Sequence, residues 1–365
     1  MVTFKAGTKY SGTVCAGPSK SHMIRVIMCA FLRRGVTEIT FSGELPKDVI
    51  CVIEAVKALG AKVTVTENTV YLDSSGEIKE RGGSVNLGEC GTGYAFFRVL
   101  SQFPGWSIDV GRSGTLEKRD YGFADVEFDG CGNVIVDGSI SSQGVSGAMI
   151  AATFCREKKY NIIIKGKMAS PGYVQMTADV LRLFDKTGPI SVCAEPDFSA
   201  IAVFKAANYL GCDFTFPPFK GYSLQPDFSA ESLFGSLSPD VNKNPDTAAL
   251  LAVIAANRTK KTVISGTGRL KNKESDRQNG TAELINALGG KAVVSGDKIE
   301  IFGTGGLKGG QVQAKDDHRV VFAAFLASLI SKTDVTVDGA EEAVKKSCPD
   351  FFEILKAAEV QSDEI

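Results

Sequence analysis

The sequence predicts an α/β protein made of two lobes that are built from similar units. Its 365 residues are too many for one ordinary hydrophobic core and suit two. An amphipathic helix, a glycine break and an alternating strand follow one another in residues 49–65 and again in residues 281–301. The junctions are alike, because residues 58–62 (ALGAK) have a counterpart in residues 287–291 (ALGGK). Glycine commonly caps a helix end, so the repetition of the whole module is what indicates repeated units.

Composition excludes several classes of protein. The chain has 41 Lys and Arg against 42 Asp and Glu, and a formal charge of −1 does not suggest binding to nucleic acid or an anionic membrane surface. Nine cysteines without CxxC spacing are typical of a reduced compartment and predict neither disulfides nor structural zinc. Residues 1–11 show no apolar leader, and no apolar run approaches the roughly 20 residues of a membrane span. We therefore expect a soluble, cytoplasmic protein.

The first motif that could carry chemistry is residues 17–25 (GPSKSHMIR), a turn that leads into a helix predicted over residues 23–33. Either Ser19 or Ser21 can cap that helix. Backbone N–H groups, Lys20 and Arg25 would then surround a point that favours an anion. Taken alone, the segment is equally explained as a capped helix with two solvated cations.

Two motifs follow in which glycine or arginine could contact a phosphate. Closely spaced glycines in residues 87–93 (LGECGTG) let the backbone approach a ligand, and Thr92 offers a hydroxyl at a helix start. The segment is not a Walker loop, because no lysine follows at the required spacing. In residues 116–119 (LEKR), Arg119 follows a turn. Neither motif is specific by itself, since a single arginine in a loop is usually solvated.

Two serine-containing turns precede predicted helices. Residues 138–143 (GSISSQ) enter an apolar helix predicted over residues 145–154, and residues 170–173 (SPGY) precede a helix over residues 174–184. Several hydroxyls and an amide at a buried helix start are more than a cap requires, which favours a polyol ligand. The alternative is that one serine caps the helix and the others face water.

Charged residues are densest in residues 271–277 (KNKESDR), with residues 244–247 (NPDT) before them and residues 316–319 (DDHR) after them. Helical spacing predicts Lys273 and Arg277 on one face with Glu274 close beside them, an arrangement that can poise an acid or a base. A solvated helix face is the competing explanation.

Three further residues could join this charged region. Asp246 is either part of the site or a helix cap. His318 is one of only two histidines and stands between an aspartate and an arginine, so its proton is open to tuning. Lys346 opens a last motif, residues 346–352 (KSCPDFF).

In this order the motifs resemble those of the EPSP synthase family of enolpyruvyl transferases, and the resemblance runs from Pro18 to Phe352. The blocks at residues 273–277 and 317–319 are specific to that family, whereas the glycine and serine turns are not. The resemblance implies two similar lobes, each of three βαβαββ units in an inside-out α/β barrel, with the active site in the cleft between them. It also implies that residues 1–12 and 197–365 form the first lobe and residues 13–196 the second.

The resemblance further implies an activity without metal or organic cofactor, carried out by a monomer. The enolpyruvyl group of phosphoenolpyruvate is transferred to the 5-hydroxyl of shikimate 3-phosphate by addition and elimination, and phosphate is released. Asp246 matches a carboxylate that contacts the shikimate hydroxyls, and Glu274 and Lys20 match residues implicated in proton transfer. His318 and Lys346 match residues near the departing phosphate. Which residue performs which proton transfer stays open.

The same resemblance assigns substrate contacts residue by residue. The residues that match phosphoenolpyruvate contacts are Lys20, Gly91, Arg119, Gln143, Arg277, Arg319 and Lys346, and Thr92 is a further expected substrate-binding residue. The residues that match shikimate 3-phosphate contacts are Ser21, Arg25, Ser141, Ser142, Ser170, Tyr173, Asp246 and Lys273. These cations come from both halves of the chain, as binding of two anionic substrates requires.

Several positions depart from the family pattern. Ala95 stands where an arginine is common, and Arg98 is a candidate substitute one turn later. His22 and Ile24 replace smaller or polar residues, and the chain is shorter than most members of the family. Two alternatives stay open: a transferase with another acceptor, and a paralogue that binds an anionic metabolite without turnover. Ser141, Ser142 and Lys273 argue against the first alternative, and the carboxylates retained among the cations argue against the second.

Overall fold

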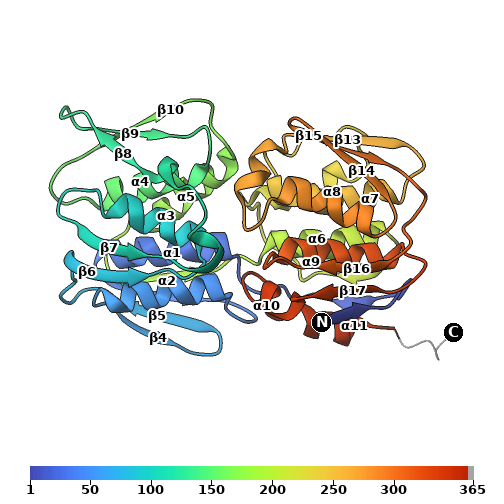
Figure 1. Cartoon of the computed structure of the whole chain (residues 1–365). Helices are drawn as coiled ribbons and strands as arrows, with labels where there is room; N and C mark the ends of the chain where they lie inside the picture. Colours follow the sequence, from blue (N-terminus) through green and yellow to red (C-terminus); the bar gives the residue numbers. More distant parts are fainter. Residues whose placement is uncertain (361–365) are drawn as a thin grey trace. The chain divides into compact units, whose positions relative to one another are not determined.

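The computed structural model describes residues 1–360, which fall into two compact units (Figure 1). Unit 2 is Gly17–Pro196, and unit 1 comprises Met1–Ala16 and the chain from Asp197 onwards. The first division lies at Gly17 and not at the expected residue 13. The reason is that β2 (Ser11–Thr13) pairs in parallel with β12 (Asp213–Thr215) of unit 1, and Ala16 packs against Phe198.

Unit 2 contains helices and three sheets, whose strand orders are β11-β3-β5-β4, β10-β9-β8 and β6-β7. Its helices are α1 (Lys20–Arg33), α2 (Lys47–Ala58), α3 (Gly91–Leu100), α4 (Ser142–Phe154) and α5 (Pro171–Leu183), with the 3₁₀ turns η1 (Gly114–Leu116) and η2 (Gly122–Ala124). Its strands are β3 (Val36–Thr40), β4 (Lys62–Val65), β5 (Thr69–Asp73), β6 (Arg81–Asn86), β7 (Ser107–Gly111), β8 (Val126–Phe128), β9 (Asn133–Asp137), β10 (Asn161–Lys165) and β11 (Ile190–Cys193).

Unit 1 also contains three sheets, β1-β17-β16, β13-β15-β14 and β12-β2. Its helices are α6 (Phe198–Tyr209), α7 (Ala248–Ala256), α8 (Arg277–Ala287), α9 (His318–Leu329), α10 (Ala340–Val344) and α11 (Phe351–Ala358), with η3 (Pro226–Leu233), η4 (Pro245–Thr247) and η5 (Gly268–Asn272). Its remaining strands are β1 (Val2–Phe4), β13 (Lys261–Ser265), β14 (Lys291–Ser295), β15 (Lys298–Phe302), β16 (Gly310–Gln313) and β17 (Val335–Asp338).

Within each unit, apolar helices form the centre and sheets lie outside them. All residues of α7 except Ala249 are buried, and a helix that is hydrophobic on every side is stable only inside a core. Strand β10, by contrast, is exposed along most of its length. Figure 1 shows the same layering in unit 2, where β8, β9 and β10 lie on one side of the helices and β4 and β5 on the other.

The repeated module predicted from the sequence is confirmed. Residues 49–65 are in α2 and β4, and residues 281–301 are in α8, β14 and β15. A complete βαβαββ unit has four strands, and within residues 1–360 only the sheet β11-β3-β5-β4 reaches that number. The other five sheets of the described residues have two or three strands each. Among these described residues, no helix has the length and apolarity needed to cross a membrane.

Candidate active site

The charged motifs of unit 1 lie at the starts of helices. Asp276 caps α8 by accepting a hydrogen bond from the Asn279 N–H at 3.0 Å. Asp317 caps α9 in the same way, with the Arg319 N–H at 2.9 Å. A helix start carries unsatisfied N–H groups and partial positive charge, so these positions suit anions.

The segment before α8 is not the helix that the sequence predicted. Lys273 and Arg277 were expected on one helical face, which is wrong, because η5 ends at Asn272 and α8 begins only at Arg277. Lys273 itself has an extended backbone. The intervening loop nevertheless brings Glu274 to Arg277, with 2.5 Å between Oε2 and Nη2.

Arg277 is the centre of an ion-pair cluster. Its Nε and Nη2 donate to the two carboxylate oxygens of Asp317 at 2.7 and 3.1 Å, and its Nη1 donates to Oδ1 of Asp246 at 2.8 Å. Only 8% of the Arg277 side chain is exposed, and a buried charge is stable only when it is paired. Burial opposes the charge, but Asp317, Glu274 and Asp246 outweigh it and raise the pKa of the guanidinium.

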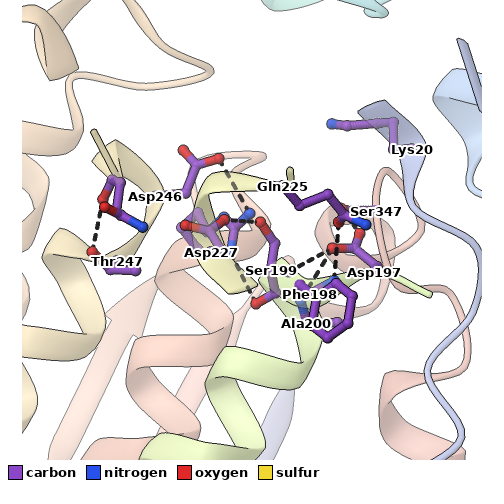
Figure 2. A network of polar contacts seen from close by, with 12 residues as sticks. Lys20, Asp197, Phe198, Ser199, Ala200, Gln225, Asp227, Asp246, Thr247 and Ser347 are labelled. Atoms are coloured by element: carbon purple, nitrogen blue, oxygen red, sulfur yellow. Dashed lines mark hydrogen bonds and ion pairs between the residues drawn. The ribbon is translucent and has the colours of Figure 1, made fainter. Parts of the chain in front are cut away.

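Asp246 is held as a carboxylate within this cluster (Figure 2). Its Oδ2 lies 3.4 Å from Nη2 of Arg319. Burial alone would raise the pKa of Asp246, but Arg319, Lys273 and Arg277 hold it well below its usual range. Burial also lowers the pKa of the Lys273 ammonium, partly offset by Asp246. The site therefore places the Asp246 carboxylate and a lysine of lowered pKa, Lys273, close to the guanidinium groups of Arg277 and Arg319.

Asp227, on η3, is a member of this region that the sequence motifs missed. It is 4% exposed, and its Oδ2 accepts a hydrogen bond from the Ser199 hydroxyl (Figure 2). Burial and the neighbouring Asp246 raise the pKa of Asp227 to about 6. A lone aspartate in a short 3₁₀ segment has no spacing pattern that marks it, so only the fold identifies it.

His318 and Lys346 are both buried in unit 1, at 2% and 5% exposure. The His318 ring packs edge-on against Phe322 at 5.5 Å between centroids. The Lys346 ammonium donates to the main-chain oxygen of Asp316 at 3.0 Å. Lys315 and Asp316 both have positive φ, 51° and 55°, which is rare for residues other than glycine and recurs at functional sites.

Unit 2 has a different centre, the buried Arg25 of α1. Its Nε donates to the Thr177 hydroxyl at 2.8 Å, its Nη1 to the Ser21 main-chain oxygen at 2.6 Å and its Nη2 to the Ser146 hydroxyl at 3.4 Å. The guanidinium also lies over the Tyr173 ring, 5.7 Å from its centroid. In residues 1–360 no carboxylate pairs with Arg25, and burial lowers its pKa to about 10. A buried cation with neutral partners attracts an anion.

The other unit 2 motifs also start helices. Ser19 and not Ser21 caps α1, since its Oγ accepts from the His22 N–H, and Lys20 forms an ion pair with Asp48 at 3.1 Å. The sequence motifs did not point to Asp48, which lies on another helix. Ser170, which precedes α5, is buried with a positive φ of 46°.

The starts of α3 and α4 are joined directly. The Gln143 side-chain amide donates to the Thr92 hydroxyl at 3.0 Å. Ser141 caps α4 by accepting from the Gln143 N–H, and Ser142 is buried. Cys90 caps α3, and Thr92 lies in the first turn of that helix, as the sequence predicted. These contacts place the polar residues of two motifs at one end of the unit.

Gly91 and Arg119 form a small cradle at the start of α3. A Cβ on Gly91 would lie 2.4 Å from the Tyr121 hydroxyl and 3.6 Å from Nη1 of Arg119, so the close approach requires glycine. Arg119 donates through Nη2 to the Thr115 hydroxyl at 2.9 Å. Arg119 has no carboxylate within ion-pair distance in the described part of the chain.

The residues around Ala95 explain one departure from the family pattern. Ala95 is fully buried in α3, and Arg98 lies in the last turn, where Asp125 holds it at 2.6 Å. Arg98 is thus at the opposite end of α3 from Gly91. Arg112, which the sequence motifs missed, is a closer neighbour of the cradle: its Nη1 donates to the Arg119 main-chain oxygen at 3.1 Å, and its guanidinium lies 5.0 Å from the Tyr94 ring centroid.

The side chains gathered in the two units suit anionic ligands better than a metal ion. Within residues 1–360, no group of three or more His, Cys, Asp or Glu residues is arranged to hold a metal ion. The sites in both units instead combine cations, hydroxyls and helix starts, which is the chemistry that binds phosphates and carboxylates.

Comparisons with known proteins agree with this chemistry. A family model described as EPSP synthase (3-phosphoshikimate 1-carboxyvinyltransferase) matches residues 223–355. A 3-phosphoshikimate 1-carboxyvinyltransferase of Clostridium perfringens is 27% identical over 96% of each chain, and one of Clostridium acetobutylicum is 32% identical over 60% of this chain and 59% of its own. An EPSP synthase structure from Acinetobacter baumannii aligns with a TM-score of 0.70 at 18% identity, covering 98% of both chains. The expected fold class, the two-lobe inside-out α/β fold, is thereby confirmed.

Proposed function

We propose that this chain is a member of the EPSP synthase family and that it transfers the enolpyruvyl group of phosphoenolpyruvate to the 5-hydroxyl of shikimate 3-phosphate. The observation that carries the proposal is the cluster around Asp246, in which Arg277 and Arg319 contact a carboxylate and Glu274 lies beside them. Acid–base groups embedded among cations suit a reaction that moves protons next to anionic substrates.

The proposed reaction is an addition followed by an elimination. In the addition, the 5-hydroxyl oxygen bonds to C2 of phosphoenolpyruvate, its proton passes to Asp246, and C3 receives a proton from Glu274 or Lys20. In the elimination, C3 returns a proton, the C2–O bond to phosphate breaks, and the double bond re-forms. His318 and Lys346 stabilise the charge on the departing phosphate.

We assign substrate contacts to the residues that match the family motifs. For shikimate 3-phosphate, Arg25 is the leading phosphate ligand, because it is a buried cation whose partners in the structure are neutral. Its companions are Ser21, Ser141, Ser142, Ser170, Tyr173, Asp246 and Lys273. The residues assigned to phosphoenolpyruvate are Lys20, Gly91, Thr92, Arg119, Gln143, Arg277, Arg319 and Lys346.

The test is release of phosphate by the purified protein supplied with both substrates. We expect release only when both are present, and a fall of about 100-fold or more in Glu274→Ala, the range of a lost acid–base group. Glu283→Ala is the matched control, because Glu283 also pairs with a cation but is exposed on α8. Binding of shikimate 3-phosphate without any phosphate release would refute turnover and favour the non-catalytic alternative. Release with a different acceptor alcohol only would refute the proposed acceptor.

A cytoplasmic location and a monomeric state are further parts of the proposal. Sedimentation of the purified chain at micromolar concentration should give the mass of one chain, 38.7 kDa. A larger mass would contradict it.

A further inference from the structure

Arg319 is loosely held for a buried cation. Its contact with Asp246 is 3.4 Å, compared with 2.8 Å for the contact between Arg277 and the same carboxylate. Its Nη1 reaches the Ser199 main-chain oxygen at only 3.5 Å. Its Nε is buried and has no hydrogen-bond partner in residues 1–360. A guanidinium has five N–H donors, and one that makes only long contacts can exchange one acceptor for another at low cost.

Within residues 1–360, one carboxylate oxygen of Asp227 lacks a hydrogen-bond donor in the same way that Nε of Arg319 lacks an acceptor. Its Oδ2 accepts from the Ser199 hydroxyl, but its Oδ1 is buried and, like Nε of Arg319, has no hydrogen-bond partner among the described residues. Unsatisfied buried polar atoms are rare and need a reason. Asp227 and Arg319 interact electrostatically, and Figure 2 shows Asp227 beside Asp246 in the same network. The Arg319 guanidinium thus pairs with Asp246 and also acts electrostatically on Asp227.

We propose that Asp227 is a positioning residue of the reaction: its carboxylate draws Arg319 from Asp246, so that Asp246 can accept the hydroxyl proton. This inference rests on the proposed function. Arg319 and Arg277 together leave Asp246 a weak base. An anionic Asp227 both weakens the Arg319 contact and adds a like charge, and each effect raises the proton affinity of Asp246.

The charged surroundings of Asp227 come from three elements besides η3. Arg319 on α9, Asp246 on η4 and Asp197 at the cap of α6 act on it electrostatically, and the Ser199 hydroxyl on α6 donates a hydrogen bond to it. Burial and the two aspartates raise its pKa, while Arg319 and the hydroxyl lower it, to a balance of about 6. Because the pKa of Asp227 lies above that of an ordinary aspartate, we expect its carboxylate to support Asp246 at neutral pH and to lose this effect in acid.

The experiment is the pH dependence of kcat for phosphate release between pH 5 and 8.5. In the native protein kcat should fall as pH drops through about 6. Asp227→Asn, which is neutral at every pH, should lose this acid limb and run at the acid plateau throughout. At pH 7.5 the expected loss is about tenfold, the equivalent of one pKa unit at Asp246. The KM for phosphoenolpyruvate should change less than kcat.

Ser199→Ala is a second variant, which tests the inference independently if Asp227→Asn does not fold. Removing the hydroxyl removes a hydrogen bond that lowers the pKa of Asp227. The acid limb should consequently move to higher pH. A limb that stays at the native position in both variants overturns the inference.

A titration without turnover separates this inference from the proposed function. In protein with ¹³C-labelled aspartate carboxyl groups, one carboxyl resonance should titrate near pH 6 and be missing in Asp227→Asn. If that resonance is present but no phosphate is released, the proposed function fails and the charge state of Asp227 stands. If no resonance titrates near pH 6, the inference fails whether or not the protein is active.

Discussion

The central arginines of the two units have opposite surroundings, charged in unit 1 and neutral in unit 2. Arg277 in unit 1 is surrounded by Asp246, Glu274 and Asp317, whereas Arg25 in unit 2 has hydroxyl and carbonyl partners and two aromatic rings. An anion that binds Arg277 must therefore exchange places with a carboxylate. An anion that binds Arg25 instead neutralises a buried positive charge that has no carboxylate partner among the described residues. Unit 1 is consequently suited to reactions that shift protons, and unit 2 to holding a phosphate.

The largest effect is expected from a change in the ion-pair cluster of unit 1. Asp246→Asn preserves the shape of the side chain but removes the carboxylate shared by Arg277 and Arg319. Without a proton acceptor, kcat should fall by about 100- to 10,000-fold. Steady-state phosphate release measures this, and the melting temperature shows whether the fold survives. A fall in affinity for shikimate 3-phosphate with an unchanged kcat would show that Asp246 only binds.

The next effect tests the unit 2 side. Arg25→Lys keeps the charge but cannot reach Thr177, Ser21 and Ser146 together. Each lost charged hydrogen bond is worth about 1.5–3 kcal/mol, so the Kd for shikimate 3-phosphate should rise about 10- to 100-fold. Calorimetry with the single substrate measures it. Arg33→Lys is the control, because Arg33 is a half-buried arginine at the other end of the same helix, and this variant should bind normally.

A smaller effect concerns the cradle formed by Gly91 and Arg119. Arg112 carries no ion pair in residues 1–360 and lies over the Tyr94 ring, next to the Arg119 main chain. Arg112→Ala should raise the KM for phosphoenolpyruvate several-fold, the effect of about 1 kcal/mol. Arg98→Ala is the matched comparison, because Arg98 contacts the same tyrosine but is paired with Asp125. Equal KM values in the two variants would contradict a role for Arg112.

The smallest effect separates capping carboxylates from reacting ones. Asp276 is exposed and caps α8, so Asp276→Ala should lower the free energy of unfolding by about 1 kcal/mol. Urea unfolding followed by circular dichroism measures the change. Within residues 1–360 the Asp276 carboxylate bonds to Asn279 and not to the Arg277 guanidinium, so kcat should change less than in Asp246→Asn.

Local patterns predicted the fold better than they predicted the geometry of the site. The helix–glycine–strand modules depend on neighbouring residues, and they appear as predicted in α2 with β4 and in α8 with β14 and β15. The block at residues 273–277 was marked as a charged site, but its helical geometry was wrong because Asp276 caps α8 and ends the loop there. The roles of the individual site residues stay predictions.

The residues that sequence patterns missed share one property: their partners lie far away in the sequence. Asp48 pairs with Lys20 on another helix, Asp227 with Ser199, and Arg112 with the ring of Tyr94. No periodicity joins such residues, because tertiary packing alone brings them together. The choice of Ser19 over Ser21 as the cap of α1 likewise depends on the backbone at that turn.

The two ends of unit 2 meet. Pro18 and Pro196 form an isolated antiparallel bridge, and the Ser19 N–H donates to the Glu195 main-chain oxygen at 2.8 Å. The chain therefore enters and leaves unit 2 at one place, the arrangement that lets one domain interrupt the chain of another at little cost to either. A change of length inside unit 2 can thus leave the course of the chain in unit 1 unaltered, because both crossings lie at Pro18 and Pro196.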